Sequence, residues 1–256
     1  MNTHIPLKGI EVGDIGPKGG YQAKDNGYLY FNNFSIPRCS LLNRYTKVDS
    51  DGNFSISGNP RFAYATMMVT RIGIIYFASY NLVKALVIAT RYSIQRKQFN
   101  TLEEGKSEKR IIDYQAQQAA FIPILAFAFS GFFTNVSGLY DEMMHKINTK
   151  NDFKLMKELH SLCSCLKAFY TEEAFAYLKT IRELCGGHGF LANSNLPYII
   201  DVFAPFVTLE GDNYVMYQQT AKHIIKSVTD VLRGKKIKGN LEYINDIMSY
   251  NKYDLK

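Results

Sequence analysis

Apolar residues recur with a helical period over most of the chain after residue 60. The stretch 61–99, RFAYATMMVTRIGIIYFASYNLVKALVIATRYSIQRKQF, contains no proline, and Asn59 and Pro60 precede it in the order typical of a helix start. The same period predicts three further helical stretches, at about 111–148, 152–184 and 212–233. Their connections are short enough for neighbours to run antiparallel, so the pattern predicts an up-and-down four-helix bundle.

Single residues mark interruptions in these predicted helices. Pro123 lies inside the second stretch and predicts a kink, because its ring removes a backbone donor and crowds the preceding turn. Asn151 and Asp152 are typical caps for the start of the third stretch. Gly186 and Gly187 follow the last residues of that stretch, where glycine commonly ends a helix.

The first 57 residues carry a strand pattern instead. Asp25, Asn26 and Gly27 form a turn signal before the alternating stretch YLYFNNFSI, and DSDGN marks a second turn further on. These signals predict β-hairpins in a small β portion over 1–57, followed by the helical portion over 58–256. The predicted fold class is therefore mainly α. Strands in so small a portion have difficulty burying both faces, so we expect further chain to cover them.

Composition agrees with a folded globular protein, since 46% of the 256 residues are hydrophobic. The N-terminal segment MNTHIPLKGIEVGD lacks the apolar core of a secretory signal. The longest apolar run, IGIIYFASYNLV, is too short for a bilayer, so we expect no membrane span. Positive charge is concentrated near the C-terminus, in Lys222, Lys226, Arg233, Lys235, Lys236 and Lys238. This stretch suits either a phosphate-bearing ligand or a solvated helix face.

The cysteines predict no disulfide framework and no metal site. The four of them are scattered, which favours a reducing compartment. Cys163 and Cys165 are two positions apart on a predicted helix and face different directions, and no nearby second pair completes a zinc set. We therefore interpret this pair as structural.

Two motifs near helix ends suit a flat or phosphate-bearing ligand. LCGGHGF, residues 184–190, lacks side chains where a flat ligand or another backbone could approach closely, although a simple helix stop explains it equally well. RYSIQRKQF, residues 91–99, places Arg91, Arg96 and Lys97 at a helix end. Cations there are favoured by the helix dipole, or they bind a diphosphate.

A third motif, TLEGDN, places two acids near the start of the last predicted helix. Asp212 or Thr208 suits a helix cap. Glu210 is harder to explain as a cap, because the residues before it are still apolar. A carboxylate held in apolar surroundings suits a general base that works near neutral pH.

Taken in order along the chain, these motifs resemble the peroxisomal acyl-CoA oxidases, flavoproteins of the acyl-CoA dehydrogenase superfamily. The resemblance rests on GDIGPKGGY, DNGYL and IPR in the β portion, and on RYSIQRKQF, CGGHGF and EGDNYVM in the helical portion. Each motif alone is weak, but the ordered set is specific and covers essentially the whole chain. The residue after EGDN is Tyr214, where the family usually has Thr.

The resemblance implies an enzyme and a set of site residues. The implied reaction is FAD-dependent α,β-desaturation of fatty acyl-CoA to trans-2-enoyl-CoA, with O2 reduced to hydrogen peroxide, as the first step of peroxisomal fatty-acid β-oxidation. Glu210 matches the catalytic base and Arg71 an arginine near the acyl-CoA site. The FAD-binding residues are Arg96, Gln98, Phe99, Gly186 and Gly187, of which Arg96 and Phe99 match residues that contact the flavin of a neighbouring subunit. A peroxisomal homodimer is implied, with no nucleic acid partner.

The family pattern also has parts without a counterpart here. An N-terminal helical domain, the first half of the β-domain and a second C-terminal helical domain are not matched, and the chain ends in YNKYDLK where the family has a peroxisomal signal. We therefore expect a shortened oxidase whose activity alone is open. Two alternatives remain: an inactive subunit that pairs with a full-length oxidase, and an acyl-CoA dehydrogenase that passes its electrons to a flavoprotein.

Overall fold

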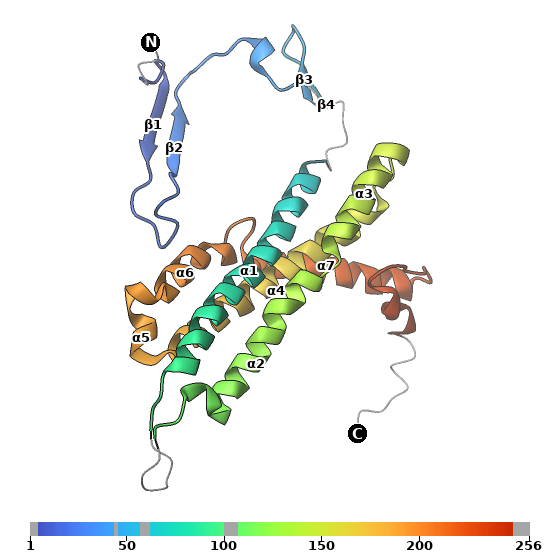
Figure 1. Cartoon of the computed structure of the whole chain (residues 1–256). Coiled ribbons are helices and arrows are strands. Elements are labelled where there is room, and N and C mark those ends of the chain that lie inside the picture. The colour runs from blue at the N-terminus through green and yellow to red at the C-terminus, as the bar shows by residue number, and fades with distance from the viewer. Residues whose placement is uncertain (1–4, 44–45, 57–61, 100–106, 248–256) are drawn as a thin grey trace. The chain divides into compact units, whose positions relative to one another are not determined.

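The computed structural model describes residues 5–43, 46–56, 62–99 and 107–247 (Figure 1). The chain divides into two compact units, Met1–Ala65 and Thr66–Lys256. The domain boundary expected from the sequence, between 57 and 58, lies outside the described residues.

The first unit contains two separate antiparallel hairpins, which confirms the strand pattern. Strand β1 (Ile10–Asp14) pairs with β2 (Gly27–Phe31), and β3 (Thr46–Val48) pairs with β4 (Phe54–Ile56). A short 3-10 turn, η1 (Arg38–Ser40), lies between them. All of β2 is exposed, so neither face of that strand is covered within the unit, as its size suggested.

The second unit is almost entirely helical. Its helices are α1 (Phe62–Gln95), α2 (Gln115–Ser130), α3 (Val136–Lys150), α4 (Lys154–Leu184), α5 (Gly186–Phe190), α6 (Leu196–Phe203) and α7 (Asn213–Leu232). Its 3-10 turns are η2 (Ile111–Asp113), η3 (Gly131–Phe133), η4 (Ala192–Ser194), η5 (Ala204–Val207) and η6 (Glu242–Asp246). The mainly α fold class is confirmed.

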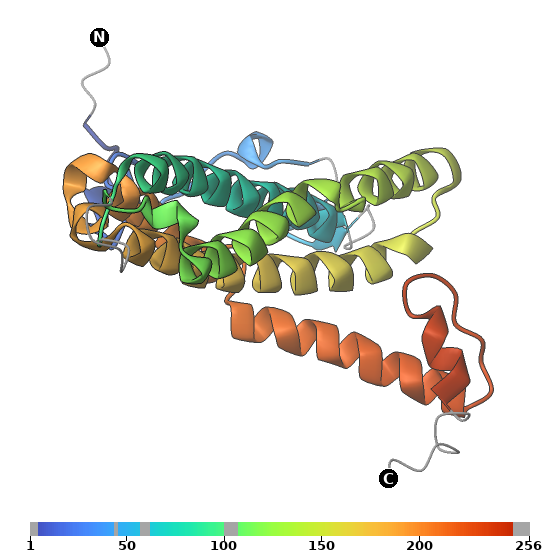
Figure 2. The same ribbon diagram turned by 60° about the horizontal axis from the view of Figure 1, so that its bottom comes forward.

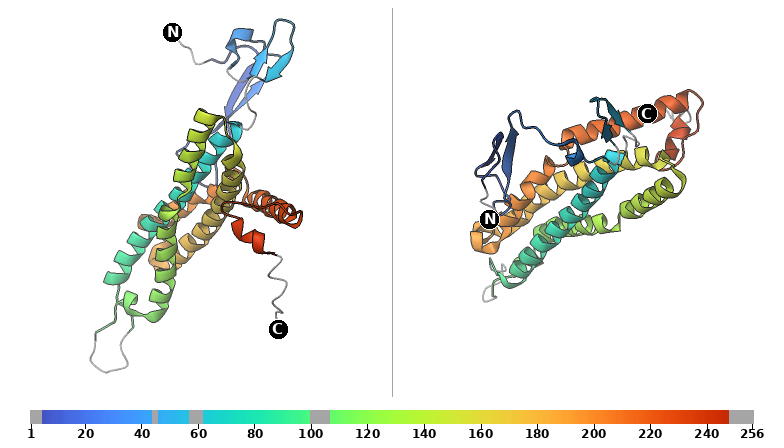
Figure 3. Two further views of the ribbon diagram at one scale, coloured as in Figure 1. Left: turned by 90° about the vertical axis from the view of Figure 1, so that its right-hand side faces the viewer. Right: turned by 90° about the horizontal axis from the view of Figure 1, so that it is seen from above.

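The long helices run beside one another in alternating directions. Figure 3 shows α1, α2 and α4 side by side in both views. Helix α7 runs antiparallel along the first half of α4, where the hydroxyl of Thr220 donates to the carbonyl of Ser161 at 3.3 Å (Figure 2). The fully buried apolar residues of α1 recur at helical spacing and form its core face: Met68, Ile75, Ala78, Leu82, Ala85 and Ala89.

The predicted second helix is divided into α2 and α3 at a place that the sequence did not indicate, and the expected kink at Pro123 stays a prediction. Pro123 lies inside α2 without ending it, and the break comes at η3, between α2 and α3. Gly131, in η3, is buried against α1 so closely that a Cβ there would collide with Ser79 Oγ. The hydroxyl of Thr134 donates to the carbonyl of Gly131 at 3.0 Å and holds the end of the turn. Close packing against α1 at η3, more than proline chemistry, therefore sets this break.

The segment between α4 and α7 is more ordered than the sequence suggested. Helix α4 ends at Leu184 and Gly186 has a φ of 57°, which confirms the glycine stop. Helices α5 and α6 and the turns η4 and η5 then fill the stretch up to Val207. The rings of Phe203 and Phe206 pack against Phe77 of α1 and bury this segment, with ring centroids 6.4 and 4.5 Å away.

Two helical stretches, Ala65–Gln95 and Gln115–Lys150, are long and apolar enough to cross a membrane by length and composition. Each is longer than the apolar run considered above. Core helices of water-soluble proteins meet the same criterion, and 56% of the apolar window in the first stretch is buried inside the protein, against 28% in the second. The expected absence of a membrane span therefore stays a prediction.

Candidate functional site

A strained turn between η5 and α7 carries Glu210. The residue has a φ of 55° and Gly211 one of 107°, so two successive residues lie at positive φ. A non-glycine residue there costs on the order of 1–3 kcal/mol and persists only where its surroundings hold it. Asp212 follows as the N-cap of α7, accepting a hydrogen bond from the Tyr214 amide at 2.9 Å. This confirms Asp212, rather than Thr208, as the helix cap.

Two buried cations lie beneath this turn. Arg71 of α1 is 2% exposed and donates from Nε to the carbonyl oxygen of Glu210 at 3.1 Å. It also donates to Ser164 Oγ at 3.1 Å and to His160 Nδ1 at 3.4 Å. Lys167 of α4 is fully buried, and its Nζ donates to the carbonyl of Gly211 at 2.7 Å. The backbone carbonyls of Glu210 and Gly211 are thus held by cations from two helices.

The side chain of Glu210 is half-buried. Its backbone carbonyl is occupied by Arg71, but its carboxylate accepts no hydrogen bond from the side chains and amides of the described residues. A carboxylate without a hydrogen-bond donor among the described residues, on a turn whose backbone Arg71 and Lys167 hold, is suited to accept a proton from a bound molecule.

The charges around Lys167 act on its titration. Burial, followed by the charge of the nearby Arg71, lowers the pKa of Lys167 to about 8. The carboxylates of Asp212, Glu172 and Glu210 oppose this shift. Burial, followed by the charge of Arg71, also lowers the pKa of His160 on the same helix.

The free energy of unfolding of the wild type is expected to rise with pH between about pH 8 and 10.5, and Lys167→Met is expected to abolish this rise. In this window the unfolded chain binds more protons than the folded chain, because the pKa falls from 10.5 to about 8 on folding. The free energy of unfolding therefore rises with pH, by about 3 kcal/mol in all. Below pH 8 both states hold the proton and the group contributes no slope. Urea unfolding of both proteins from about pH 7 to 10 measures the difference, and parallel curves would contradict the assignment.

The other predicted site residues gather at one end of α1. Arg96 is exposed and donates to the amide oxygen of Gln98 at 2.8 Å. Phe99 is 69% exposed and has a φ of 61°. The Tyr92 hydroxyl lies 3.0 Å from Nδ1 of His188, which ties this end of α1 to α5. The structure therefore brings the RKQF and CGGHGF motifs together, as Figure 1 shows where α5 lies beside α1.

The glycines of CGGHGF differ in what the chain itself requires. Gly189 is buried, and a Cβ there would collide with the carbonyl oxygen of Arg182. Gly186 needs its positive φ to end α4. Gly187 has neither requirement, since a Cβ built on it would have no atom of the described residues within 4 Å outside its own helix backbone and chain neighbours. Gly187 and Arg96 are both exposed, in two segments that the Tyr92–His188 contact joins, and they fit a surface that a flat, anionic cofactor could approach.

The two sets of residues are far apart along α1. The helix between Arg71 and Tyr92 is roughly 30 Å long at 1.5 Å per residue. The Glu210 turn contacts Arg71. Arg96 instead follows Tyr92 at the far end of the helix, and Tyr92 contacts His188, the residue after Gly187. The structure thus places the predicted site residues in two separate groups on one chain.

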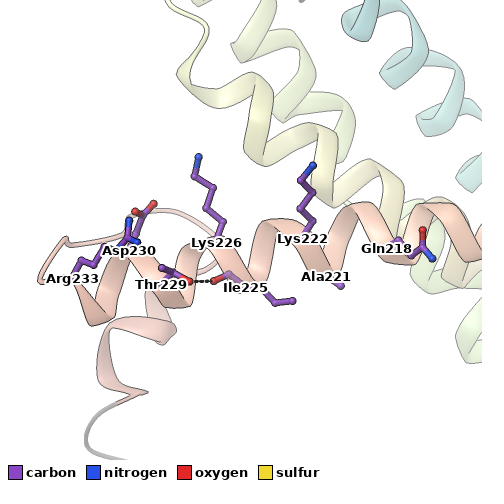
Figure 4. A pocket seen from close by; sticks show the side chains of 8 residues that line it. All are labelled: Gln218, Ala221, Lys222, Ile225, Lys226, Thr229, Asp230 and Arg233. Atoms are coloured by element: carbon purple, nitrogen blue, oxygen red, sulfur yellow. Dashed lines mark hydrogen bonds between the residues drawn. The ribbon is translucent and has the colours of Figure 1, made fainter.

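The basic stretch of α7 forms an open face rather than an enclosed site. The groove of about 570 Å³ on this face is lined only by residues from Gln218 to Arg233, on α7 and its C-cap (Figure 4). Lys222 and Lys226 project from the same side of the helix. Lys235 donates to Asp230 at 2.9 Å. These contacts favour a solvated helix face.

Cys163 and Cys165 lie on α4, where burial disfavours the thiolate form of both side chains. Burial raises the pKa of Cys163 to about 12 and also raises the pKa of Cys165. Both are free thiols, so the geometry supports their structural interpretation.

Sequence reasoning missed the polar residues of α4 beneath the turn. Ser164, Lys167 and Thr171 are fully buried and recur at spacings of three and four, so they share one face of the helix. The sequence did contain one signal for them: Lys167 lies at helical spacing from residues expected in the core. Asn213, which Lys167 and Thr171 contact, was interpreted only as part of the EGDN motif.

The comparisons identify the family. Residues 64–225, more than half of the chain, match the family described as acyl-CoA oxidase, C-alpha1 domain. The chain belongs to the acyl-CoA oxidase family. It is 40% identical over 252 residues to peroxisomal acyl-coenzyme A oxidase 1 from both Cavia porcellus and Homo sapiens, covering 97% of this chain. It spans 38% of the length of those relatives.

Solved structures agree with this membership. An acyl-CoA oxidase from Lycopersicon esculentum (tomato) is 36% identical with a TM-score of 0.92, covering 100% of this chain and 40% of that one. Acyl-CoA oxidase-2 of Caenorhabditis elegans, bound with FAD, ascaroside-CoA and ATP, is 35% identical with a TM-score of 0.89, covering 95% of this chain and 37% of that one. The partial acyl-CoA dehydrogenase-like fold predicted from the sequence is therefore confirmed.

Proposed function

We propose that this chain acts as an FAD-dependent acyl-CoA oxidase in peroxisomal fatty-acid β-oxidation. The observation that carries the proposal is Glu210, whose carboxylate accepts no hydrogen bond from the described residues and whose turn is held by Arg71 and Lys167. Membership of the acyl-CoA oxidase family supports the substrate class and the use of O2.

Glu210 removes the proton from the α-carbon of the acyl thioester. That proton is only weakly acidic, so the base must be positioned and shielded from water while the thioester oxygen gains charge. The half-buried side chain and the fixed backbone of Glu210 serve both needs. Bound FAD would supply the acceptor for the hydride that leaves the β-carbon, and the means of transferring its electrons to O2. The product is a trans-2-enoyl-CoA.

Arg96, Gln98, Phe99, Gly186 and Gly187 would hold FAD. The exposed guanidinium of Arg96 suits the diphosphate, and Gly187 leaves room for the flat adenosine portion. Since this surface lies roughly 30 Å along α1 from the Arg71 level, it supports binding of a flavin that belongs to a neighbouring subunit. A homodimer would then unite the two groups of site residues.

Arg71 was predicted to lie near the acyl-CoA substrate. In the structure its guanidinium is buried and contacts Glu210, Ser164 and His160. This geometry supports an indirect role through the Glu210 turn, and direct substrate binding by Arg71 stays a prediction.

The electron acceptor separates the oxidase from the alternatives. Purified chain with FAD is reduced by acyl-CoA without oxygen, and the return of the flavin absorbance is then followed with O2 or with an electron-transfer flavoprotein. Reoxidation by O2 with peroxide release supports the oxidase, whereas reoxidation only by the flavoprotein supports a dehydrogenase. No flavin binding, together with co-purification of an active full-length oxidase, supports an inactive subunit.

A further inference from the structure

We infer that Lys167 is a positioning residue for Glu210, because its ammonium group fixes the backbone turn from which the proposed base projects. The inference rests on the proposed function for its catalytic meaning. The contacts themselves belong to the chain alone.

The ammonium of Lys167 uses all three of its N–H donors on this turn. It donates to the carbonyl of Gly211 at 2.7 Å, to the side-chain oxygen of Asn213 at 2.8 Å and to the carbonyl of Val207 at 3.3 Å. Val207 ends η5, and Asn213 begins α7. Lys167 therefore joins the backbone before Glu210 to the backbone after it.

Asn213 extends this connection back to α4. Its side chain is 6% exposed and donates to Thr171 Oγ1 at 3.0 Å, to a carboxylate oxygen of Glu172 at 3.0 Å and to the carbonyl of Ala168 at 3.3 Å. The oxygen that accepts from Lys167 also accepts from Thr171 Oγ1 at 3.1 Å. The first residue of α7 is thus locked to one face of α4.

A role limited to stability does not explain an ammonium group at this position. Burying such a charge costs several kcal/mol, and an apolar side chain of similar size often gives a more stable core. No carboxylate oxygen among the described residues lies within 4.0 Å of Lys167 to offset that cost as an ion pair. Its partners are instead the oxygens that flank Glu210, so the charge is used to define the shape of the turn.

The turn needs such support because Glu210 lies at positive φ. Without the ammonium, the carbonyls of Val207 and Gly211 lose their buried donor, and the turn can relax towards ordinary backbone angles. The carboxylate of Glu210 would then leave its working position. A displacement of about 1 Å can lower a rate by about 100-fold.

Hydrogen–deuterium exchange on the full chain tests the inference. In Lys167→Met, the amides from 208 to 213 are expected to exchange about tenfold faster than in wild type, while those of α1 and of the second half of α4 change less than twofold. Lys179→Met is the matched control, because Lys179 is an exposed lysine on the same helix, and its exchange pattern should equal that of wild type. An unchanged turn, or an equal increase throughout the helices, would overturn the inference.

Two further variants keep the inference testable if Lys167→Met does not fold. Lys167→Gln keeps one donor group and is expected to give the same local pattern with a smaller increase, and Lys167→Arg, which keeps the charge, should restore most of the protection. Equal protection of the turn in Lys167→Gln and wild type would overturn the inference.

The exchange measurement needs neither substrate nor flavin, so it separates this inference from the proposed function. If Lys167→Met loses protection only at the turn and the wild-type protein forms no peroxide, the positioning role of Lys167 is supported and the oxidase proposal is refuted. If the wild type is active, Lys167→Met is expected to lower kcat by about 100-fold with KM within twofold. A rise in KM at constant kcat would contradict positioning of the base.

Discussion

Glu210→Gln is expected to lower acyl-CoA-dependent peroxide formation by about 10²- to 10⁴-fold, which is the usual contribution of a general base. Glutamine keeps the size and the backbone of the turn but cannot accept the α-proton. Peroxide release from wild type and variant, at saturating acyl-CoA and FAD, measures the effect.

Asp212→Asn is the matched control for this variant. It makes the same change of charge two residues away, and asparagine caps α7 as well as aspartate does. Its activity should stay within about twofold of wild type. Equal losses in both variants would show that negative charge at this turn, rather than the base itself, is what the reaction needs.

Arg96→Ala is expected to weaken FAD binding by about 10- to 100-fold, because a hydrogen bond to a charged group contributes about 1.5–3 kcal/mol. The fold should not change, since Arg96 is exposed and its guanidinium donates only to Gln98 among the described residues. Titration of the apoprotein with FAD, followed by flavin fluorescence, gives the dissociation constant.

Arg91→Ala provides the comparison for Arg96. Arg91 is another exposed arginine near the same end of α1, and it is expected to leave the FAD affinity unchanged. If both variants weaken binding to the same extent, the positive charge of the helix end acts as a whole. The specific diphosphate contact assigned to Arg96 would then be wrong.

The periodicity of the sequence predicted the long helices because each buries one continuous apolar face. Helices α1, α4 and α7 lie close to their predicted positions. The break between α2 and α3 could not be predicted, because Gly131 is required by its contact with Ser79 on another helix. Local rules predicted only a kink at Pro123, inside α2.

The candidate site shows the same division. Glu210 and the two flavin motifs could be recognised from ordered sequence motifs, and the structure places RKQF beside CGGHGF. The support beneath Glu210 could not be read in this way, because Arg71, Lys167 and Asn213 come from three helices and meet only in the folded chain. Sequence patterns within one segment do not record such contacts.

The most direct test of the central claim is the stoichiometry of the reaction on purified, FAD-loaded chain. Acyl-CoA, O2, enoyl-CoA and peroxide are measured together over one time course. The account predicts that trans-2-enoyl-CoA and hydrogen peroxide appear in equal amounts as acyl-CoA and O2 disappear. A flavin-loaded protein that leaves acyl-CoA unchanged, or that forms enoyl-CoA without peroxide, would contradict it.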